Sequence, residues 1–106
     1  MGSYMFKVNY SVEGLKGVIR EGAEHRAAFI GSLYEKAGGS MESFHFAFGE
    51  TDVYVIGQLP DDTTAAAIAM AVGASGVGDI ETVKLLTPAE ADAARAINTG
   101  YQPPGA

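Results

Sequence analysis

The stretch from residue 44 to residue 62 decides the fold of this chain. It reads FHFAF (44–48), GETD (49–52), VYVIGQL (53–59) and PDD (60–62). Two runs rich in aromatic and β-branched residues flank a short polar segment that contains glycine, which is the pattern of a β-hairpin. We expect the turn at Glu50 and Thr51, so that Phe46 lies opposite Val55. Because side chains alternate along a strand, one face of this hairpin is wholly apolar. The other face mixes polar and apolar groups: His45, Ala47, Tyr54, Ile56 and Gln58.

The segments on either side of the hairpin alternate between the periodicities of strand and helix. Residues 4–10 alternate as a strand does, and residues 12–37 carry apolar side chains every three or four positions, as an amphipathic helix does. Glycines at 14, 17 and 22 disfavour the first half of this helix, so we expect a kink and a firm part from Ala23 onward. Further along we expect a helix over 63–72 opened by Asp61 and Asp62, a strand over 79–87, a helix over 88–97 capped by Thr87, and a loose tail over 98–106.

The order of these elements predicts the fold class. Strand–helix–strand–strand–helix–strand, with an extra C-terminal helix, is a ferredoxin-like α+β domain, here over residues 4–97. Right-handed crossovers place both main helices on one face of a four-stranded antiparallel sheet. The other face stays uncovered and carries apolar side chains such as Met5, Tyr54 and Ile56. Such a patch, roughly several hundred Å², is at or above what monomers tolerate. Burying it contributes about 25 cal/mol per Å², so we expect two copies to pack sheet to sheet as a homodimer.

The composition limits the classes of partner and of chemistry. The 106 residues carry a net charge of −6 and seven scattered basic side chains, which disfavours nucleic acid and membrane surfaces as partners. The chain has no cysteine, which excludes disulfides, thiolate metal sites and thiol catalysis. We see no membrane span and no signal-peptide pattern, and we expect a cytoplasmic protein. We expect no metal, because two histidines without ligand spacing make no motif. We expect no cofactor either, because the glycine-rich run 73–78 leaves a helix, whereas a phosphate loop enters one.

An ordered set of short runs resembles the GYD domain family of small bacterial proteins. The set comprises FGETDV (48–53), LPDD (59–62) before an alanine-rich helix, GDIET (78–82), LLTP (85–88), and Gly14, Arg26 and Gly38-Gly39 in and after the first helix. The resemblance covers roughly residues 4 to 90 and implies a dimeric α/β barrel. It implies no established reaction and no accepted catalytic residues. The family is named for Gly-x-Tyr-Asp-type turns, and Thr51 stands here at the position of the tyrosine.

His45 is the side chain of greatest functional interest, because it shares the uncovered face with Tyr54, Lys7 and Asn9. A histidine, a phenol and an amine in one shallow cavity suit proton transfer or the orientation of a small polar ligand. The alternative interpretation is that these groups satisfy one another inside the dimer interface.

His25 and Arg26 form a second set of candidates on the first helix. His25 borders the apolar stripe and lies four residues after Glu21, with which it can pair. Arg26 is placed at the edge of the core, where it either binds an anionic ligand bidentately or pairs with a carboxylate such as Asp52.

Three hypotheses of function follow, of which the third, a regulatory partner protein that uses its C-terminal tail, rests only on the prolines of that tail. The favoured one is a homodimeric domain that binds a small polar or anionic molecule, with Arg26, Lys7, Asn9 and His25 as ligand-binding residues. The alternative is a small cofactor-independent enzyme, of isomerase or oxygenase type, in which His45 is the base and Tyr54 or Arg26 orients the substrate.

Overall fold

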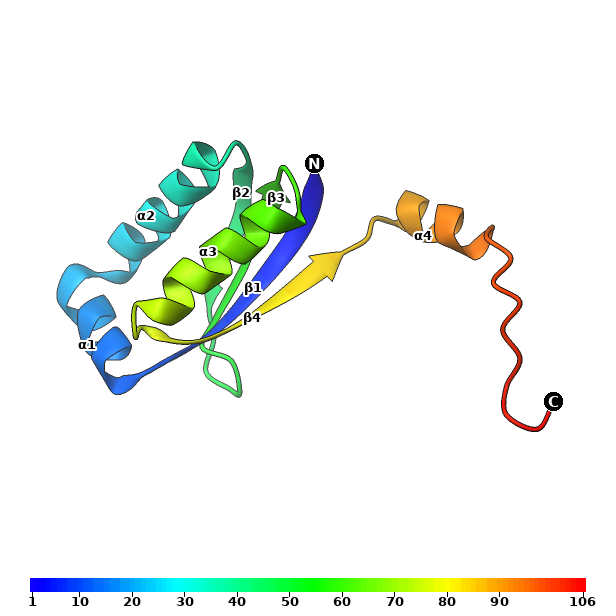
Figure 1. Cartoon of the computed structure of the whole chain (residues 1–106). Helices are drawn as coiled ribbons and strands as arrows, with labels where there is room; N and C mark the ends of the chain where they lie inside the picture. The colour runs from blue at the N-terminus through cyan, green and yellow to red at the C-terminus, as the bar shows by residue number, and fades with distance from the viewer.

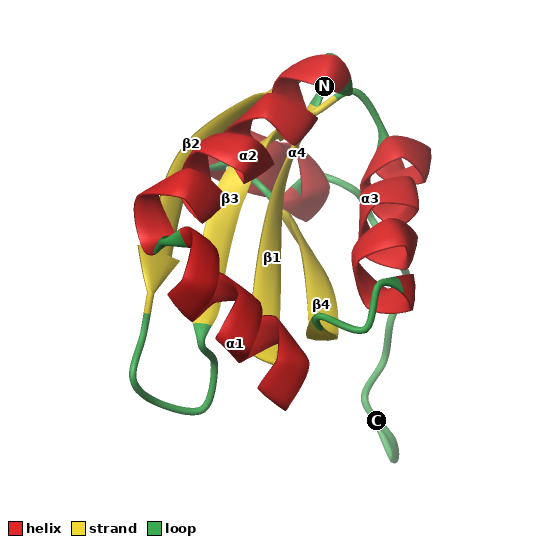
Figure 2. Cartoon of the chain, turned by 90° about the vertical axis from the view of Figure 1, so that its left-hand side faces the viewer, coloured by secondary structure: helices red, strands yellow, loops and turns green.

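The computed structural model describes all residues from 1 to 106. The elements are β1 (Gly2–Tyr10), α1 (Val12–Glu21), α2 (Ala23–Lys36), β2 (Ser40–Phe46), β3 (Val53–Leu59), α3 (Asp62–Ala74), β4 (Gly78–Leu85) and α4 (Pro88–Arg95). The strands form one sheet in the order β2-β3-β1-β4, and every neighbouring pair is antiparallel. Figures 1 and 2 show α1, α2 and α3 together on one side of this sheet. The protein therefore has the predicted ferredoxin-like α+β fold with an extra C-terminal helix.

The single long helix expected after the first strand is two helices. α1 ends at Glu21 and α2 begins at Ala23, and Gly22 between them has a φ of 98°. Glycine adopts this conformation without the steric cost that other residues bear. The chain thus breaks at one of the three glycines that predicted a kink, and the firm part does begin at Ala23.

The core lies between the helices and the sheet face that they cover. β1 and β3 alternate strictly there, so that every second side chain points toward the helices. The alanine-rich helix α3 is opened by Asp61, whose carboxylate accepts a hydrogen bond from the Thr64 N–H at 2.8 Å. The core consists of eight buried side chains: Tyr4, Phe6, Val8, Tyr34, Val53, Val55, Leu59 and Ala65.

The expected pairing register of the hairpin is wrong by two residues. The structure places Phe46 opposite Val53, and the turn is a wider loop over residues 47–52. This loop is tied to β1, because the Asp52 N–H donates to the Val8 carbonyl at 3.1 Å and to Asn9 Oδ1 at 3.0 Å. Thr51 is 5% exposed in the loop. Since side chains alternate with a period of two, a shift of two residues leaves the predicted faces unchanged.

The C-terminal segment extends away from the packed body. α4 opens with a capping box in which Thr87 Oγ1 accepts from the Glu90 N–H at 3.1 Å and Glu90 accepts from the Thr87 N–H at 2.9 Å. Figure 1 shows α4 and the C-terminus beyond the end of β4. The Cα radius of gyration is accordingly 16.8 Å, against about 13 Å for a compact domain of this length. The second face of the sheet is therefore left uncovered within one chain.

A substitution at Gly57 tests how α2 packs against the sheet. A Cβ at this position would lie 2.5 Å from Cε1 of Tyr34 and 2.6 Å from the Ser40 carbonyl oxygen. We expect Gly57→Ala to lower the free energy of unfolding by about 1–3 kcal/mol, because overpacking forces side chain and backbone apart. The control is Gly17→Ala in α1, where a Cβ meets nothing within 4 Å; it should stabilise by about 0.5–1 kcal/mol. Urea unfolding measures both, and equal effects would contradict this packing.

Tyr4 provides a test at alkaline pH. Its hydroxyl donates to the Asp62 carboxylate in the first turn of α3, and this hydrogen bond is the main cause that raises the Tyr4 pKa to about 12. A pKa that is higher in the folded state stabilises the protein below the unfolded value of about 10, and this contribution is lost as pH rises from 10 through 12. We expect the stability difference between wild type and Tyr4→Phe to shrink over that range in urea unfolding series. A difference that stays constant from pH 9 to pH 12 would show that the ionisation of Tyr4 does not affect the free energy of unfolding.

Candidate functional site

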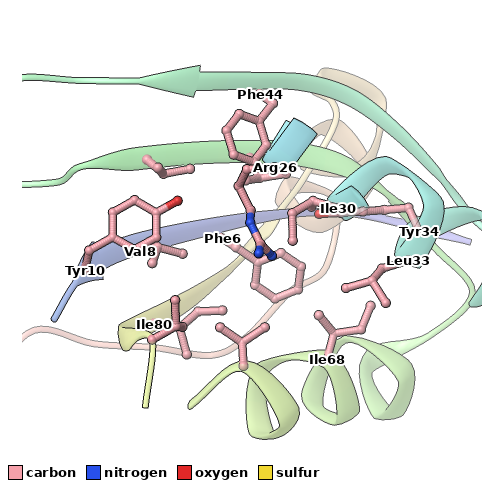
Figure 3. Close-up of a pocket in the computed structure, with 14 residues that line it drawn as sticks. Phe6, Val8, Tyr10, Arg26, Ile30, Leu33, Tyr34, Phe44, Ile68 and Ile80 are labelled. Atoms are coloured by element: carbon pink, nitrogen blue, oxygen red, sulfur yellow. The ribbon is translucent and has the colours of Figure 1, made fainter. Parts of the chain in front are cut away.

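A small apolar cavity lies between the helices and the covered face of the sheet (Figure 3). Its volume is about 60 Å³, and 13 of its 14 lining residues are hydrophobic. β1, β2, β3 and β4 form its floor, and α2 and α3 form its walls. The lining comprises Phe6, Val8, Tyr10, Arg26, Ile30, Leu33, Tyr34, Phe44, Val53, Val55, Ile68, Val72, Val77 and Ile80.

Two tyrosines are among the residues that line this cavity. Tyr34 is 1% exposed, and its buried hydroxyl has no hydrogen-bond partner. Burial raises the pKa of Tyr34, and burial likewise raises the pKa of Tyr10, a shift that the nearby Arg26 guanidinium partly opposes. Figure 3 places Tyr10 at one end of the cavity and Tyr34 at the other. Both phenols are therefore neutral near pH 7 and able to donate hydrogen bonds.

Arg26 is the only charged residue of the lining. Figure 3 shows its side chain reaching from α2 between Phe44 and Phe6. Its Nε lies 2.5 Å from Oε1 of Glu21, the last residue of α1, and its Cζ lies 5.1 Å from the centre of the Phe29 ring. The two terminal nitrogens of Arg26 have no hydrogen-bond acceptor in the chain, so they are free to bind solvent or a ligand.

A polar groove, which we call the vestibule, adjoins the cavity at Arg26. It has a volume of about 450 Å³ and lies between α1 and the turn that joins α3 to β4. Arg26 and Val77 line both the vestibule and the cavity, so the two hollows adjoin at these residues. The vestibule is lined by Glu13, Gly14, Gly17, Val18, Arg20, Glu21, Arg26, Ser75, Gly76 and Val77.

The uncovered face carries a polar row that crosses all four strands. His45 lies opposite Tyr54, Tyr54 opposite Lys7, and Lys7 opposite Glu81. Lys7 Nζ is 3.2 Å from Glu81 Oε2, so its charge is already paired. A hollow of about 160 Å³ beside the row is lined by Lys7 and Asn9 but not by His45 or Tyr54. The structure thus brings the predicted residues of this face together without enclosing a ligand site around His45.

The structure separates the second set of candidates from the first. Arg26 lies on the helix side of the sheet and His45 on the other, so the two do not act on one small molecule within a chain. Arg26 does pair with a carboxylate, which was one of its two expected roles, but the partner is Glu21. The example given, Asp52, is wrong, because the Asp52 carboxylate accepts from the Tyr10 N–H at 2.9 Å. His25 is exposed on α2, with its Nε2 3.7 Å from Glu21 as the spacing predicts.

Tyr34 and Tyr10 were not among the residues predicted for a site. The signal for Tyr34 is its spacing, because Arg26, Ile30 and Tyr34 follow one another at intervals of four on one face of α2. The signal for Tyr10 is that it continues the alternation of Tyr4, Phe6 and Val8 toward the helices.

Neither a metal centre nor a membrane span is found. No three or more His, Asp or Glu side chains lie together in an arrangement that could hold a metal ion. None of the helices combines the length and the apolarity that crossing a bilayer requires.

The unpartnered hydroxyl of Tyr34 leads to a stability prediction. A buried polar group without a partner costs about 1–3 kcal/mol, so Tyr34→Phe should raise the free energy of unfolding by about this amount. The matched control is Tyr101→Phe, at a residue that is 76% exposed, which should leave stability unchanged. Thermal and urea unfolding measure both variants. A destabilised Tyr34→Phe protein would contradict the absence of a partner.

The comparisons with known proteins concern the whole chain. No curated protein and no solved structure matches it. The model of one family, described as the GYD domain, matches residues 4–94. This match runs from the first strand to the last turn of α4 and spans both the cavity and the uncovered sheet face, so the chain belongs to the GYD domain family.

Proposed function

We propose that this protein is a homodimeric domain that binds a small molecule in the cavity between its helices and its sheet. The observation that carries this proposal is an apolar cavity of about 60 Å³ with one charged side chain, Arg26, in its lining. A concave, mainly apolar space with few polar groups is the usual form of a small-molecule site.

The size and lining of the cavity favour an organic ligand over trapped water. A volume of about 60 Å³ has room for several waters, since each needs about 10–15 Å³. Each buried water also needs two to four polar partners, and the surface of this cavity is almost wholly apolar. A molecule that is mainly apolar fills this space with fewer unsatisfied hydrogen bonds.

The uncovered sheet face supports association of two copies. Its middle row is apolar, because Met5 lies between Ile56 and Val83 in the pairing register. The adjoining row of His45, Tyr54, Lys7 and Glu81 is polar. An apolar centre bordered by polar groups is the usual arrangement of protein interfaces. Two such faces packed across a two-fold axis form the dimeric α/β barrel that we propose.

The alternative of a cofactor-independent enzyme has one observation in its favour, the direct opposition of His45 and Tyr54. In the proposed dimer these groups lie at the interface, which favours a structural role for them. A cytoplasmic and bacterial setting stays a prediction, as does the loss of the family's tyrosine at Thr51.

Ligand binding is tested by ¹H–¹⁵N NMR with a panel of small organic acids, alcohols and amines. We expect at least one class to shift the amide signals of Tyr34, Ile68 and Val53, which surround the cavity. Signals of the uncovered face, such as those of Ile56 and Lys7, should stay in place. Shifts confined to the uncovered face, or none with any class, would overturn the proposal.

The dimer is tested by light scattering coupled to size-exclusion chromatography at micromolar concentration. We expect wild type at twice the 11.0 kDa chain mass. Ile56→Asp should shift it to the monomer, because a carboxylate at the centre of an apolar interface loses its hydration without gaining a partner. The control is Met70→Asp on α3, at a site that is 74% exposed and away from that face, which should remain dimeric. A wild-type chain of monomer mass would disprove the association.

A further inference from the structure

We propose that the C-terminal segment, residues 86–106, is an arm that packs on a second copy of the chain. Its docking surface there is an exposed apolar stripe on α1, which consists of Val12, Leu15 and Ile19. This inference rests on the association of two copies in the proposed function, and it adds a contact that lies outside the uncovered sheet face.

No part of the arm is buried in its own chain. Every residue from 86 to 106 is exposed, and the side chains of Leu86, Ile97 and Tyr101 are each more than half exposed. α4 has only eight residues. Isolated helices shorter than about 12–15 residues are marginal in water, because most helical stability in proteins comes from the packing of an apolar face. α4 therefore needs a surface to pack against.

α4 has an apolar face that suits such a contact. Ala89, Ala93 and Ile97 follow one another at intervals of four, so they lie on one side of the helix and of the turn that ends it. The two alanines are small, which lets a second helix approach closely. Glu90 and Asp92 border this face and give it acidic edges.

α1 has a surface that complements this face. α1 contacts its own chain through Gly14, its only buried residue. The stripe lies on another side of the helix, and its three side chains are 50% to 75% exposed. Lys16 and Arg20 follow Val12 at intervals of four, so they lie beside the stripe. The basic edge of the stripe thus suits the acidic edges of α4.

α1 and α4 lie at opposite ends of one chain, as Figure 1 shows. Where β1 pairs with β4, Tyr10 at the α1 end lies opposite Gly78, and Ser3 at the other end lies opposite Leu85. The eight residues of β4 span about 26 Å. The arm therefore begins at the end of the sheet that is far from α1 of its own chain.

The link between β4 and α4 directs the arm outward. Only Leu86 and Thr87 separate the two elements, and Thr87 is extended, with a φ of −72° and a ψ of 160°. Pro88 restricts Thr87 to extended conformations, and the capping box also holds it. The arm thus leads away from its own α1. Across a two-fold axis perpendicular to the strands it leads toward α1 of a second copy, and the same contact forms twice.

A spin label on the arm tests this contact. The chain has no cysteine, so Ala91→Cys, on the side of α4 opposite Ala93, gives a single attachment site. Spin-labelled chains without ¹⁵N are unfolded and refolded together with ¹⁵N-labelled wild type. We expect paramagnetic broadening of the amide signals of residues 12–19 in the wild-type copy. The signal of Lys36, at the far end of α2, should stay sharp.

The reverse labelling reads contacts within one chain. Here the spin label is on the ¹⁵N chain, which is diluted into an excess of unlabelled wild type. Residues 12–19 should then stay sharp, because the arm of each labelled chain lies on an unlabelled copy.

Two matched variants test the energetic role of the arm. Ala93→Asp and Ala91→Asp place the same charge on opposite sides of α4. Ala93→Asp should raise the dimer dissociation constant at least tenfold, because it buries a carboxylate in an apolar contact, and Ala91→Asp should leave it unchanged. Ile19→Asp should act as Ala93→Asp does, and the double variant should be no weaker than either one. Analytical ultracentrifugation measures the constants, and circular dichroism confirms folding.

The outcomes separate this inference from the proposed function. If the label broadens residues 12–19 only within its own chain, broadens another surface, or broadens none, the arm contact is wrong. Equal effects of Ala93→Asp and Ala91→Asp would also contradict it, and a wild-type dimer would then support the sheet contact alone. If Ile56→Asp leaves the dimer intact while Ala93→Asp disrupts it, the sheet contact is wrong and the arm contact stands. A wild-type chain of monomer mass disproves both.

Discussion

The packing of Tyr34 on Gly57 is the contact on which the rest of the structure depends. The missing side chain of Gly57 leaves the space that the Tyr34 ring occupies, and the ring meets Phe6 edge-on at an interplanar angle of 67°. This contact sets the height of α2 above the sheet at one end of the helix. Toward the other end the helix carries Arg26, whose charged group keeps to the edge of the core. The cavity lies between the Tyr34–Gly57 contact and Arg26.

This arrangement gives the two faces of the sheet different chemistry. The covered face is mainly apolar, and Thr82 and Lys84 of the edge strand β4 are its polar exceptions. The uncovered face has an apolar row in its middle and a polar row beside it, in which Lys7 pairs with Glu81. Because Lys7 and Glu81 are paired, burying this row would leave neither of these two charges alone, but it would cost the hydration of both. An apolar cavity of this kind is suited to a mainly apolar ligand.

The site also illustrates how a small domain accommodates groups that cost stability. Tyr34 holds a hydroxyl in the core without a partner, although a phenylalanine would pack in the same space. Arg26 gives only one of its three nitrogens to Glu21 and lies beside the Phe29 ring. Unsatisfied polar groups are rare in native cores, and where they occur they mark strain or function. The Tyr34 hydroxyl is such a group, whereas the Arg26 side chain is 27% exposed and reaches solvent.

Much of the fold was determined by the sequence itself. Alternation in β1 and β3, the glycine at the break before Ala23, and the caps at Asp61 and Thr87 all act between near neighbours, so they can be recognised in the printed sequence. The two faces of the hairpin were predicted correctly for the same reason. Its pairing register was wrong by two residues, because the loop is held by hydrogen bonds to β1, which the hairpin sequence alone does not reveal. The partner of Arg26 was likewise missed.

What only the tertiary structure decided is which side chains share a space. The pairing register brings His45, Tyr54 and Lys7 into one row, as the alternation predicted, but the sheet then separates them from Arg26. The cavity joins residues from four strands and two helices, and its existence depends on a ring from α2 that meets a glycine of β3. A contact between segments far apart in the sequence does not change the periodicity of apolar residues in either segment. It depends on how the helix and the strand pack together and not on how each of them forms.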